Sequence, residues 1–439
     1  MNNYLTKKKK TFNTELKILI PSIVISFLGL VTLLSTTILS DGTFGDRSIV
    51  SRQVIFILIG YLFYFVISKL DLSYSKYLQV ILPFYVVTII SLMLVLLIGP
   101  VINNVQRWVL IGGIQIQPSE FAKITIILST AFIFSFKDRY NQWLLFLLSF
   151  ILLIPIVYLV YLEPDGSMSV LITMIWFFVA FTGLDNQLRN SISLIIIILS
   201  TVGFLLSAVL GSIFWLVLVL ISLIISIFAF YYRDEWKILI VVSFILSIIL
   251  GITSTVIWDN VLKDYQKERI EVFLDPSKDT GDAGFNVNQA KIAIGSGKIF
   301  GKGFGNGTQS KRNFLPEYRT DFIFASYAEE FGLLGSVLLL TLFAIIITTS
   351  INKTIALGKN HPYFAMIMIG ITVKLLLEVF INIGTNTGVI PATGIPLPLV
   401  SAGGSNILVT LFSLGVIQSI ISHSTQVEDT DSIVESYEN

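Results

Sequence analysis

Long apolar segments recur along this chain and leave it few ways to fold. A helix needs about 20 mostly apolar residues to cross the hydrocarbon of a bilayer, and runs of that length follow one another through nearly the whole sequence. The composition agrees, because 54% of the residues are hydrophobic and only 13% are charged, unlike an ordinary water-soluble globule. We therefore expect an all-α polytopic membrane protein in which residues 1–439 form a single membrane domain.

The apolar runs predict about twelve membrane helices. One long apolar block has to be divided at Gly211 to give a hairpin. The first run follows a basic N-terminus but is too long for a cleaved signal peptide, and no small-residue cleavage pattern follows it, so it suits a signal anchor. The predicted helices cover residues 18–40, 53–68, 78–99, 119–136, 143–162, 167–184, 191–210, 212–231, 238–257, 322–350, 362–386 and 401–422.

The distribution of lysine and arginine predicts the orientation of these helices. Basic residues gather in the N-terminal tail and in alternate loops, whereas the opposite short loops hold only Arg47, Arg52 and Arg107. Because cytoplasmic loops carry the excess of positive charge, both termini are expected in the cytoplasm and the large segment 258–321 outside. The acidic end of the chain, 423–439, lacks periodicity and is predicted to be a disordered cytoplasmic tail.

Composition also excludes several kinds of site. The chain has no cysteine and two histidines, which excludes disulfides, thiolate metal sites and cysteine nucleophiles and leaves little for a histidine-based metal site. Its formal net charge of +1 gives no reason to expect a nucleic-acid partner. Membrane lipid is the expected surrounding of most of the surface.

The large segment 258–321 concentrates the polar residues of a chain that is otherwise nearly uniform in Leu, Ile, Val and Phe. It holds nine acids, ten bases and the glycine-rich run GSGKIFGKGFGNGTQS. The run fails the spacing of a phosphate loop, since Gly301-Lys302 is followed by glycine rather than Ser or Thr. A tight-turning loop is one interpretation, and backbone amides with Lys302 at a lipid pyrophosphate are another.

Three shorter polar segments share the expected outer side: 103–120, 163–167 and 386–405. Polar, proline-broken backbone at membrane depth is tolerated where protein buries it or water reaches it. These segments are therefore expected to line one outward-facing cavity. Arg107, beside Trp108, could bind an anionic headgroup or serve as an interfacial anchor.

Ionisable residues inside the predicted spans form two local pairs. Glu120 and Lys123 lie three residues apart, and Lys374 and Glu378 lie four apart, so each pair shares a helix face. Charges within a span are costly and usually face a cavity or a partner, which makes them functional candidates. A structural ion pair that packs two helices is an equal alternative.

Three further acids lie near the outer end of one predicted helix. Asp321, Glu329 and Glu330 could hold a divalent cation, Mg²⁺ or Mn²⁺. Acids at a helix start are also common because they complement the helix dipole.

Several long motifs together resemble the SEDS family, which includes the RodA and FtsW proteins of bacteria. The GTQS and DYQ elements resemble the RodA branch more than the FtsW branch. The resemblance covers most of the chain, and its motifs are KDYQKERIEVFLDPSKD, AIGSGKIFGKGFGNGTQS, FLPEYRTDFIFASYAEEFGLLG, QRWVLIGGIQIQPSEFAK and GVIPATGIPLPLVSAGGS.

This resemblance implies a peptidoglycan glycosyltransferase of the bacterial cytoplasmic membrane. Members of the family polymerise lipid II on the outer face and work with a class B penicillin-binding protein, a transpeptidase. The family's essential loop aspartate falls on Asp279. The chain departs from the usual pattern at Thr280 and at Asp282, which adds a second carboxylate, and EPDGS replaces the typical QPDLGT. The family usually has ten helices, so an additional hairpin is expected around 191–231.

The expected mechanism is a single inverting displacement with undecaprenyl pyrophosphate as leaving group. Asp279 is the candidate base, and the expected headgroup ligands are Arg107, Lys123, Glu120, Lys302 and Ser401, with a divalent cation as a possible cofactor. A lipid II flippase or another transporter is the alternative function, because charges within spans also suit transport. A scaffold that only recruits the penicillin-binding partner is a third.

Overall fold

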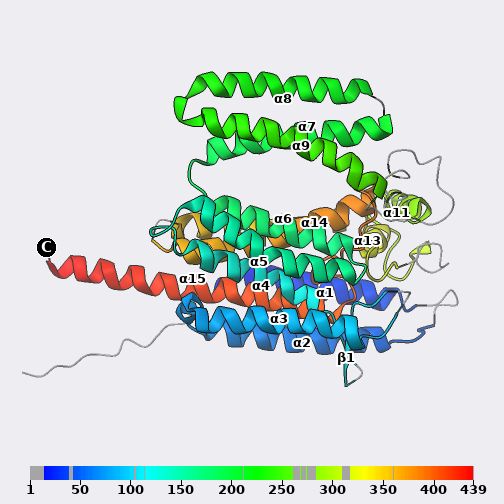
Figure 1. Ribbon diagram of the computed structural model, residues 1–439. Coiled ribbons are helices and arrows are strands. Elements are labelled where there is room, and N and C mark those ends of the chain that lie inside the picture. The colour runs from blue at the N-terminus through cyan, green and yellow to red at the C-terminus, as the bar shows by residue number, and fades with distance from the viewer. Residues whose placement is uncertain are drawn as a thin grey trace, which may run out of the picture. The chain divides into compact units, whose positions relative to one another are not determined.

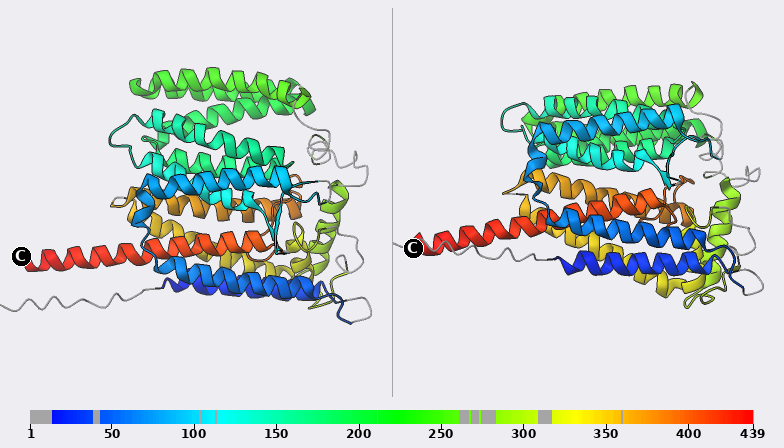
Figure 2. Two further views of the ribbon diagram at one scale, coloured as in Figure 1. Left: turned by 60° about the horizontal axis from the view of Figure 1, so that its bottom comes forward. Right: turned by 90° about the horizontal axis from the view of Figure 1, so that it is seen from below.

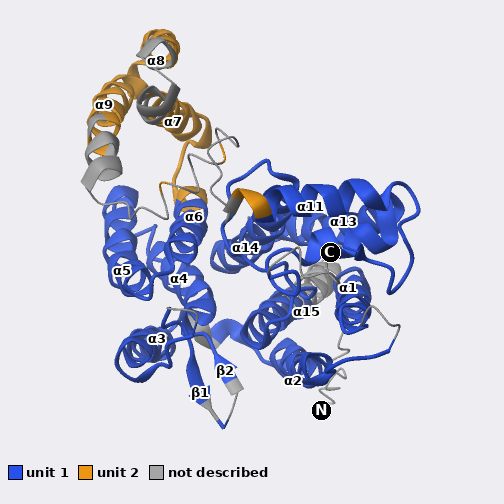
Figure 3. Ribbon diagram, turned by 90° about the vertical axis from the view of Figure 1, so that its right-hand side faces the viewer, with its two compact units in different colours: residues 1–180, 286–439 blue, residues 181–285 orange. Residues whose placement is uncertain are grey.

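The computed structural model describes the fold as α-helices with one small β-hairpin (Figure 1). The helices divide into two compact units, residues 1–180 with 286–439 and residues 181–285 (Figure 3). The described residues are 14–438 apart from 39–42, 103–104, 113, 211, 261–266, 268–272, 274–282, 309–316 and 359.

Unit 1 is a bundle whose long helices run side by side, as both views in Figure 2 show. Proline occupies the first helical turn of α4 and α14, where its missing N–H costs no hydrogen bond. The helices of this unit are α1 (Leu16–Ser35), α2 (Ser48–Lys69), α3 (Leu78–Ile98), α4 (Pro118–Phe134), α5 (Gln142–Leu162), α6 (Gly166–Gly183, which crosses the unit boundary), α11 (Ala283–Gly297, which also crosses it), α13 (Ile323–Leu357), α14 (Pro362–Thr387) and α15 (Gly404–Glu438).

Glycines allow α2 and α15 of unit 1 to pack closely. A Cβ at Gly415 would lie 2.9 Å from the carbonyl oxygen of Tyr64 and 3.0 Å from its Cα. A Cβ at Gly60 would likewise meet the side chain of Leu411. Small residues of this kind let helix backbones approach closely, which supplies packing contacts where lipid removes the hydrophobic drive for association. The contact fixes α15 along α2.

Helix α13 is broken at Gly332, whose φ is +66°. The segment before the break, 323–331, runs against the glycine-rich run. The amides of Lys302 and Gly303 donate to the carbonyls of Glu329 and Glu330 at 3.0 and 2.9 Å, and two return bonds run from residues 333 and 334 to residues 298 and 299. We call this set of backbone bonds between 298–303 and 329–334 the glycine clasp.

Unit 2 consists of α7 (Gln187–Leu210), α8 (Ser212–Tyr232) and α9 (Lys237–Asn260). The unit has a small core of its own, in which Trp236, 1% exposed, packs with Ile196, Ala229 and Ile240. The additional hairpin expected around 191–231 coincides with α7 and α8. The sequence placed both helices because apolar runs are local signals.

The expectation of an all-α polytopic membrane protein is confirmed. Among the described residues, eight helices are long and apolar enough to span a membrane. Every range predicted as a helix overlaps one in the structure. The helix α4 has 17 residues and is shorter than a full span, and it carries Glu120 and Lys123.

The structure contains two elements that the sequence did not predict. A β-hairpin, β1 (Val109–Ile111) paired with β2 (Ile114–Ile116), lies in the first polar segment, where Gly112 has a φ of +58°. The helix α11 interrupts the segment 258–321. The helix α15 continues to Glu438, since the sequence after Gly415 has neither proline nor glycine to end it. The disorder of the tail from residue 423 stays a prediction.

We expect Gly415→Ala to destabilise the protein by about 1–3 kcal/mol, because the added methyl group meets the Tyr64 backbone rather than a flexible side chain. Thermal unfolding in detergent measures this loss. The matched control is Gly295→Ala, since a Cβ at Gly295 meets nothing within 4 Å. Equal melting temperatures for the two variants would contradict close packing of α2 on α15.

Candidate functional site

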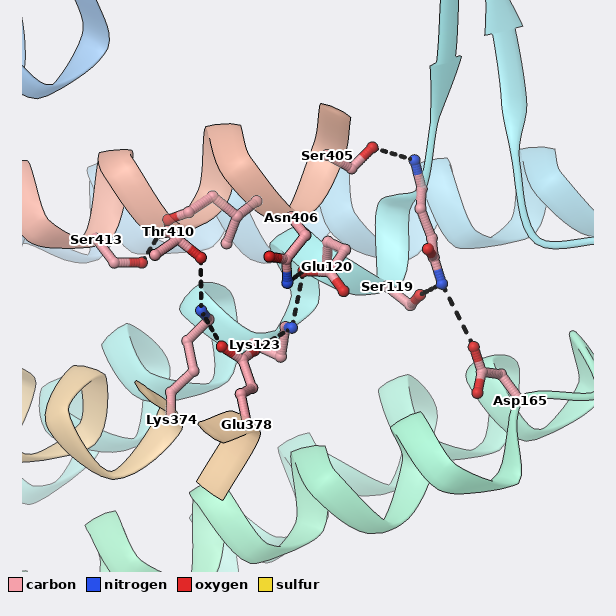
Figure 4. Close-up of polar contacts among 12 residues, drawn as sticks. Ser119, Glu120, Lys123, Asp165, Lys374, Glu378, Ser405, Asn406, Thr410 and Ser413 are labelled. Carbon is pink, nitrogen blue, oxygen red and sulfur yellow. Dashed lines mark hydrogen bonds and ion pairs between the residues drawn. The ribbon is translucent and has the colours of Figure 1, made fainter. Parts of the chain in front are cut away.

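The start of α4 brings the polar segments of unit 1 together. The amide of Gln117 donates to Ser405 Oγ at 2.9 Å, at the start of α15. The Gln117 side-chain amide donates to Ser119 Oγ at 3.1 Å and to Asp165 Oδ2 at 3.4 Å, in the turn between α5 and α6 (Figure 4). Segments 103–120, 163–167 and 386–405 thus meet at one end of unit 1, which we call the loop end.

Arg107 fixes the turn at residues 163–165. Its Nε lies 3.5 Å from Asp165 Oδ2 and 3.4 Å from the carbonyl oxygen of Glu163, and its Nη2 donates to the carbonyl oxygen of Pro164. Burial raises the pKa of Asp165, and the Arg107 guanidinium opposes that shift. The Arg107 side chain is partly exposed at 26%, so it can still face a ligand.

Below the loop end, the two local ion pairs join into one buried network (Figure 4). Lys123 Nζ lies 2.8 Å from Glu120 Oε2 on its own helix and 2.5 Å from Glu378 Oε1 on α14. Lys374 Nζ lies 2.9 Å from Glu378 Oε2. Asn406 on α15 donates to Glu120 Oε2 at 3.3 Å. The network therefore links α4, α14 and α15.

The network is buried and electrically balanced. All four ionisable side chains are at most 2% exposed. Two ammonium groups face two carboxylates, so their formal charges cancel. Lys374 also reaches Thr410 Oγ1 at 3.5 Å. Since a buried charge is tolerated only when it is paired and hydrogen-bonded, each member holds the others in place.

Lys302, one of the expected headgroup ligands, pairs with a buried acid. Its Nζ lies 2.6 Å from Glu329 Oε1, and Glu329 is fully buried. The same carboxylate oxygen accepts from Thr308 N at 2.9 Å and Thr308 Oγ1 at 2.8 Å. Lys302 therefore also fastens the glycine clasp through its side chain.

The three acids considered for a cation have separate environments. Glu330 accepts a hydrogen bond from Ser35, and the backbone oxygen of Asp321 accepts from Asn382 Nδ2 at 2.9 Å. Across the described ranges, no group of three His, Cys, Asp or Glu side chains could hold a metal ion. Asp321, Glu329 and Glu330 therefore do not form such a group, and the divalent cation stays a prediction.

Ser401, another expected ligand, is buried and ties loops together. Its Oγ donates to the carbonyl oxygen of Thr320 at 2.6 Å and accepts from the amide of Leu397 at 2.8 Å. Its own carbonyl oxygen accepts from Gln53 on α2 at 2.9 Å. These bonds position the segment after α14 over the bundle.

Asp279, the candidate base, lies outside the described residues, as does Asp282. Of the other predicted site residues, Arg107, Glu120 and Lys123 lie near the loop end. Lys302 pairs with Glu329, and Ser401 donates to the backbone of Thr320. Sequence reasoning did not assign roles to Asp165, Gln117 or Asn406. For Asp165 a signal existed, since an acid in a short turn between two apolar runs needs a partner.

The fold and the site define a class: a polytopic α-helical membrane protein with a neutral ion network beneath a polar loop end. The model of the cell cycle protein family FTSW_RODA_SPOVE matches residues 15–426. The chain belongs to this family, which the sequence motifs had already indicated.

Relatives and solved structures agree with this assignment. The chain is 32% identical over 346 residues to the peptidoglycan glycosyltransferase MrdB of Escherichia coli K12, covering 77% of each chain. It also resembles a chain of a peptidoglycan synthase complex that coordinates polymerization and crosslinking, with a TM-score of 0.64, 24% identity and coverage of 93% and 97%. The rod shape determining protein RodA of Thermus thermophilus gives a TM-score of 0.57 at 22% identity, with coverage of 96% and 98%. These two structures share the fold.

We expect Lys123→Met to destabilise the protein by about 3–5 kcal/mol, because it leaves Glu120 and Glu378 with only Lys374 to balance them. Thermal unfolding measures the loss. The double variant Glu120→Gln with Lys123→Met restores a neutral network and should recover part of the melting temperature.

Lys237→Met is the surface control for this experiment. Lys237 pairs with Asp234 at 2.6 Å, but both side chains are exposed, and such pairs contribute little. A double variant no more stable than Lys123→Met would contradict charge balance as the reason for the loss.

Proposed function

We propose that the protein is a peptidoglycan glycosyltransferase that polymerises lipid II during cell elongation. The observation that carries the proposal is its 32% identity, over 77% of both chains, to a protein named peptidoglycan glycosyltransferase. The loop end supports it, because Arg107 lies there with its side chain partly exposed. Lipid II carries a pyrophosphate, and a partly buried guanidinium is a strong ligand for such an anion.

The proposed reaction joins two lipid-linked sugars. The 4-hydroxyl of the acceptor sugar loses its proton to a base and attacks the anomeric carbon of the donor. A glycosidic bond forms, the bond from the anomeric carbon to the pyrophosphate oxygen breaks, and undecaprenyl pyrophosphate leaves with the electron pair. Because attack and departure take place on opposite faces, the configuration at the anomeric carbon inverts.

Asp279 is the proposed base, on the strength of its place in LDPSKDTGDAGF. Arg107 is the proposed cation for the developing negative charge on the leaving group. Glu120 and Lys123 would act from below as positioning residues, since the network holds the start of α4 and hence Gln117, which contacts Asp165. Lys302 and Ser401 would support the loops.

The proposed setting is the outer face of a bacterial cytoplasmic membrane, with both termini in the cytoplasm. A class B penicillin-binding protein is the proposed partner. The likeness to a chain from a complex that coordinates polymerization and crosslinking supports such a pairing. The GTQS and DYQ elements favour elongation, while the family itself spans FtsW, RodA and SpoVE.

A lipid transporter is the second candidate, and the buried network favours it. Four ionisable groups within membrane helices are typical of transport pathways. In this chain each of them is paired with an opposite charge. A flippase would move lipid II across liposomes without making polymer.

We expect Asp279→Ala to remove polymer formation from purified lipid II while the protein still inserts in the membrane and melts normally. Loss of a catalytic base typically costs 10²–10⁴-fold in rate. The neighbouring variant Asp282→Ala is the matched control and should keep most of the activity. Native rates in Asp279→Ala would assign the proton transfer to another group.

We expect a cysteine at position 291 to react from outside intact cells and one at position 235 to stay unreactive. The chain has no cysteine of its own, so Lys291→Cys and Glu235→Cys each give a single label site. Both native side chains are exposed. A membrane-impermeant maleimide provides the measurement, and permeabilised cells provide the control. The opposite pattern would place the loop end in the cytoplasm and exclude the proposed reaction.

A further inference from the structure

Glu163 is a buried acid with no ion-pair partner in the part of the chain that the structure describes. It follows α5 directly and begins the turn that Arg107 binds. Its relative exposure is 0%, and neither carboxyl oxygen has a hydrogen-bond partner among the described residues. Arg107 contacts Glu163 through the backbone carbonyl only.

The neighbouring acid, Asp165, has the partners that Glu163 lacks. Its Oδ1 accepts from the amide of Met168 at 3.2 Å, and its Oδ2 lies near Gln117 Nε2 at 3.4 Å and Arg107 Nε at 3.5 Å. The turn therefore holds two acids in different states of solvation. One is satisfied by donors, and the other faces none.

A carboxyl group in such a place is far more stable with its proton. An ionised carboxylate needs donors or water, whereas the neutral acid loses much less on burial. The pKa of Glu163 is raised to about 9: burial is the largest cause, the negative charge of Asp165 adds to it, and Arg107 opposes both. Of the two acids in this turn, Glu163 is therefore the one that keeps its proton.

We propose that Glu163 is a positioning residue: as an uncharged acid, it leaves Arg107 paired with Asp165 alone and free to meet an anionic headgroup. The link to the headgroup rests on the proposed function. The protonated state of Glu163 rests on the turn itself.

The charged groups around this turn explain how loss of the proton would act. Arg107 and Asp165 face Glu163 from the segment before β1 and from its own turn. From α4, Glu120 and Lys123 act on Asp165 with opposite signs. Ionised Glu163 would therefore add an unbalanced negative charge beside Arg107. That charge would compete for the guanidinium and repel a pyrophosphate.

The same proton also affects stability. The ordinary pKa of the group is 4.5, and in the folded protein it is about 9. Between these two values the folded protein holds a proton that the unfolded chain releases, so stability falls as the pH rises through this range. Glutamine cannot ionise and has nearly the same shape. The melting temperature of Glu163→Gln should therefore exceed that of the native protein by a margin that widens from about pH 5 to about pH 9.

Thermal unfolding across this pH range tests the protonated state, with Glu235→Gln as control because the Glu235 side chain is exposed. The control should melt in parallel with the native protein at every pH.

Infrared spectra give a second measurement. At neutral pH the native protein should show a carboxylic-acid carbonyl band that Glu163→Gln lacks, and titration to high pH should remove it. A constant margin together with identical spectra would overturn the proposal.

Polymerisation of lipid II, with each variant normalised to its own rate at neutral pH, tests the positioning role. One pH unit above its pKa, only about a tenth of Glu163 keeps its proton, so the native rate should fall about tenfold while Glu163→Gln keeps its rate. Equal losses in both would overturn positioning by Glu163. Absence of any polymer, with the melting and infrared results as expected, would instead reject the proposed function and leave the protonated acid established.

Discussion

The structure depends on a lysine that two carboxylates share inside the bundle. Lys123 lies 2.8 Å from Glu120 and 2.5 Å from Glu378, with none of its side chain exposed. Lipid offers no hydrogen-bond partners and no screening, so protein groups must compensate this charge. The requirement fixes α4 against α14. Through Gln117, directly before α4, the same requirement sets the loop end.

Local sequence signals predicted much of this fold. Apolar runs located the membrane helices, and spacings of three and four residues identified both ion pairs. Their union did not follow from the sequence, because Lys123 and Glu378 are 255 positions apart. The break of α13 was also missed, since Gly332 stands within an apolar stretch that gives no turn signal. Resemblance supplied the role of Asp279, which the geometry leaves as a proposal.

The two charged regions of unit 1 have different electrical character. The inner network pairs each ammonium group with a carboxylate, and its side chains are at most 2% exposed. The turn at Glu163, Pro164 and Asp165 has one guanidinium for two acids, and only one of these acids has donors. A response to pH is therefore expected at the turn, whereas the network holds α4, α14 and α15 together.

The glycine clasp joins two stretches through main-chain atoms, and this restricts how the region can diverge. Lys298, Ile299 and their neighbours bond through amides and carbonyls, so replacing their side chains leaves those bonds in place. Gly301 and Gly332 both have positive φ, and each faces the backbone of the other stretch, so neither admits a side chain. Related sequences are thus expected to keep glycine at these two positions, while the residues between them vary.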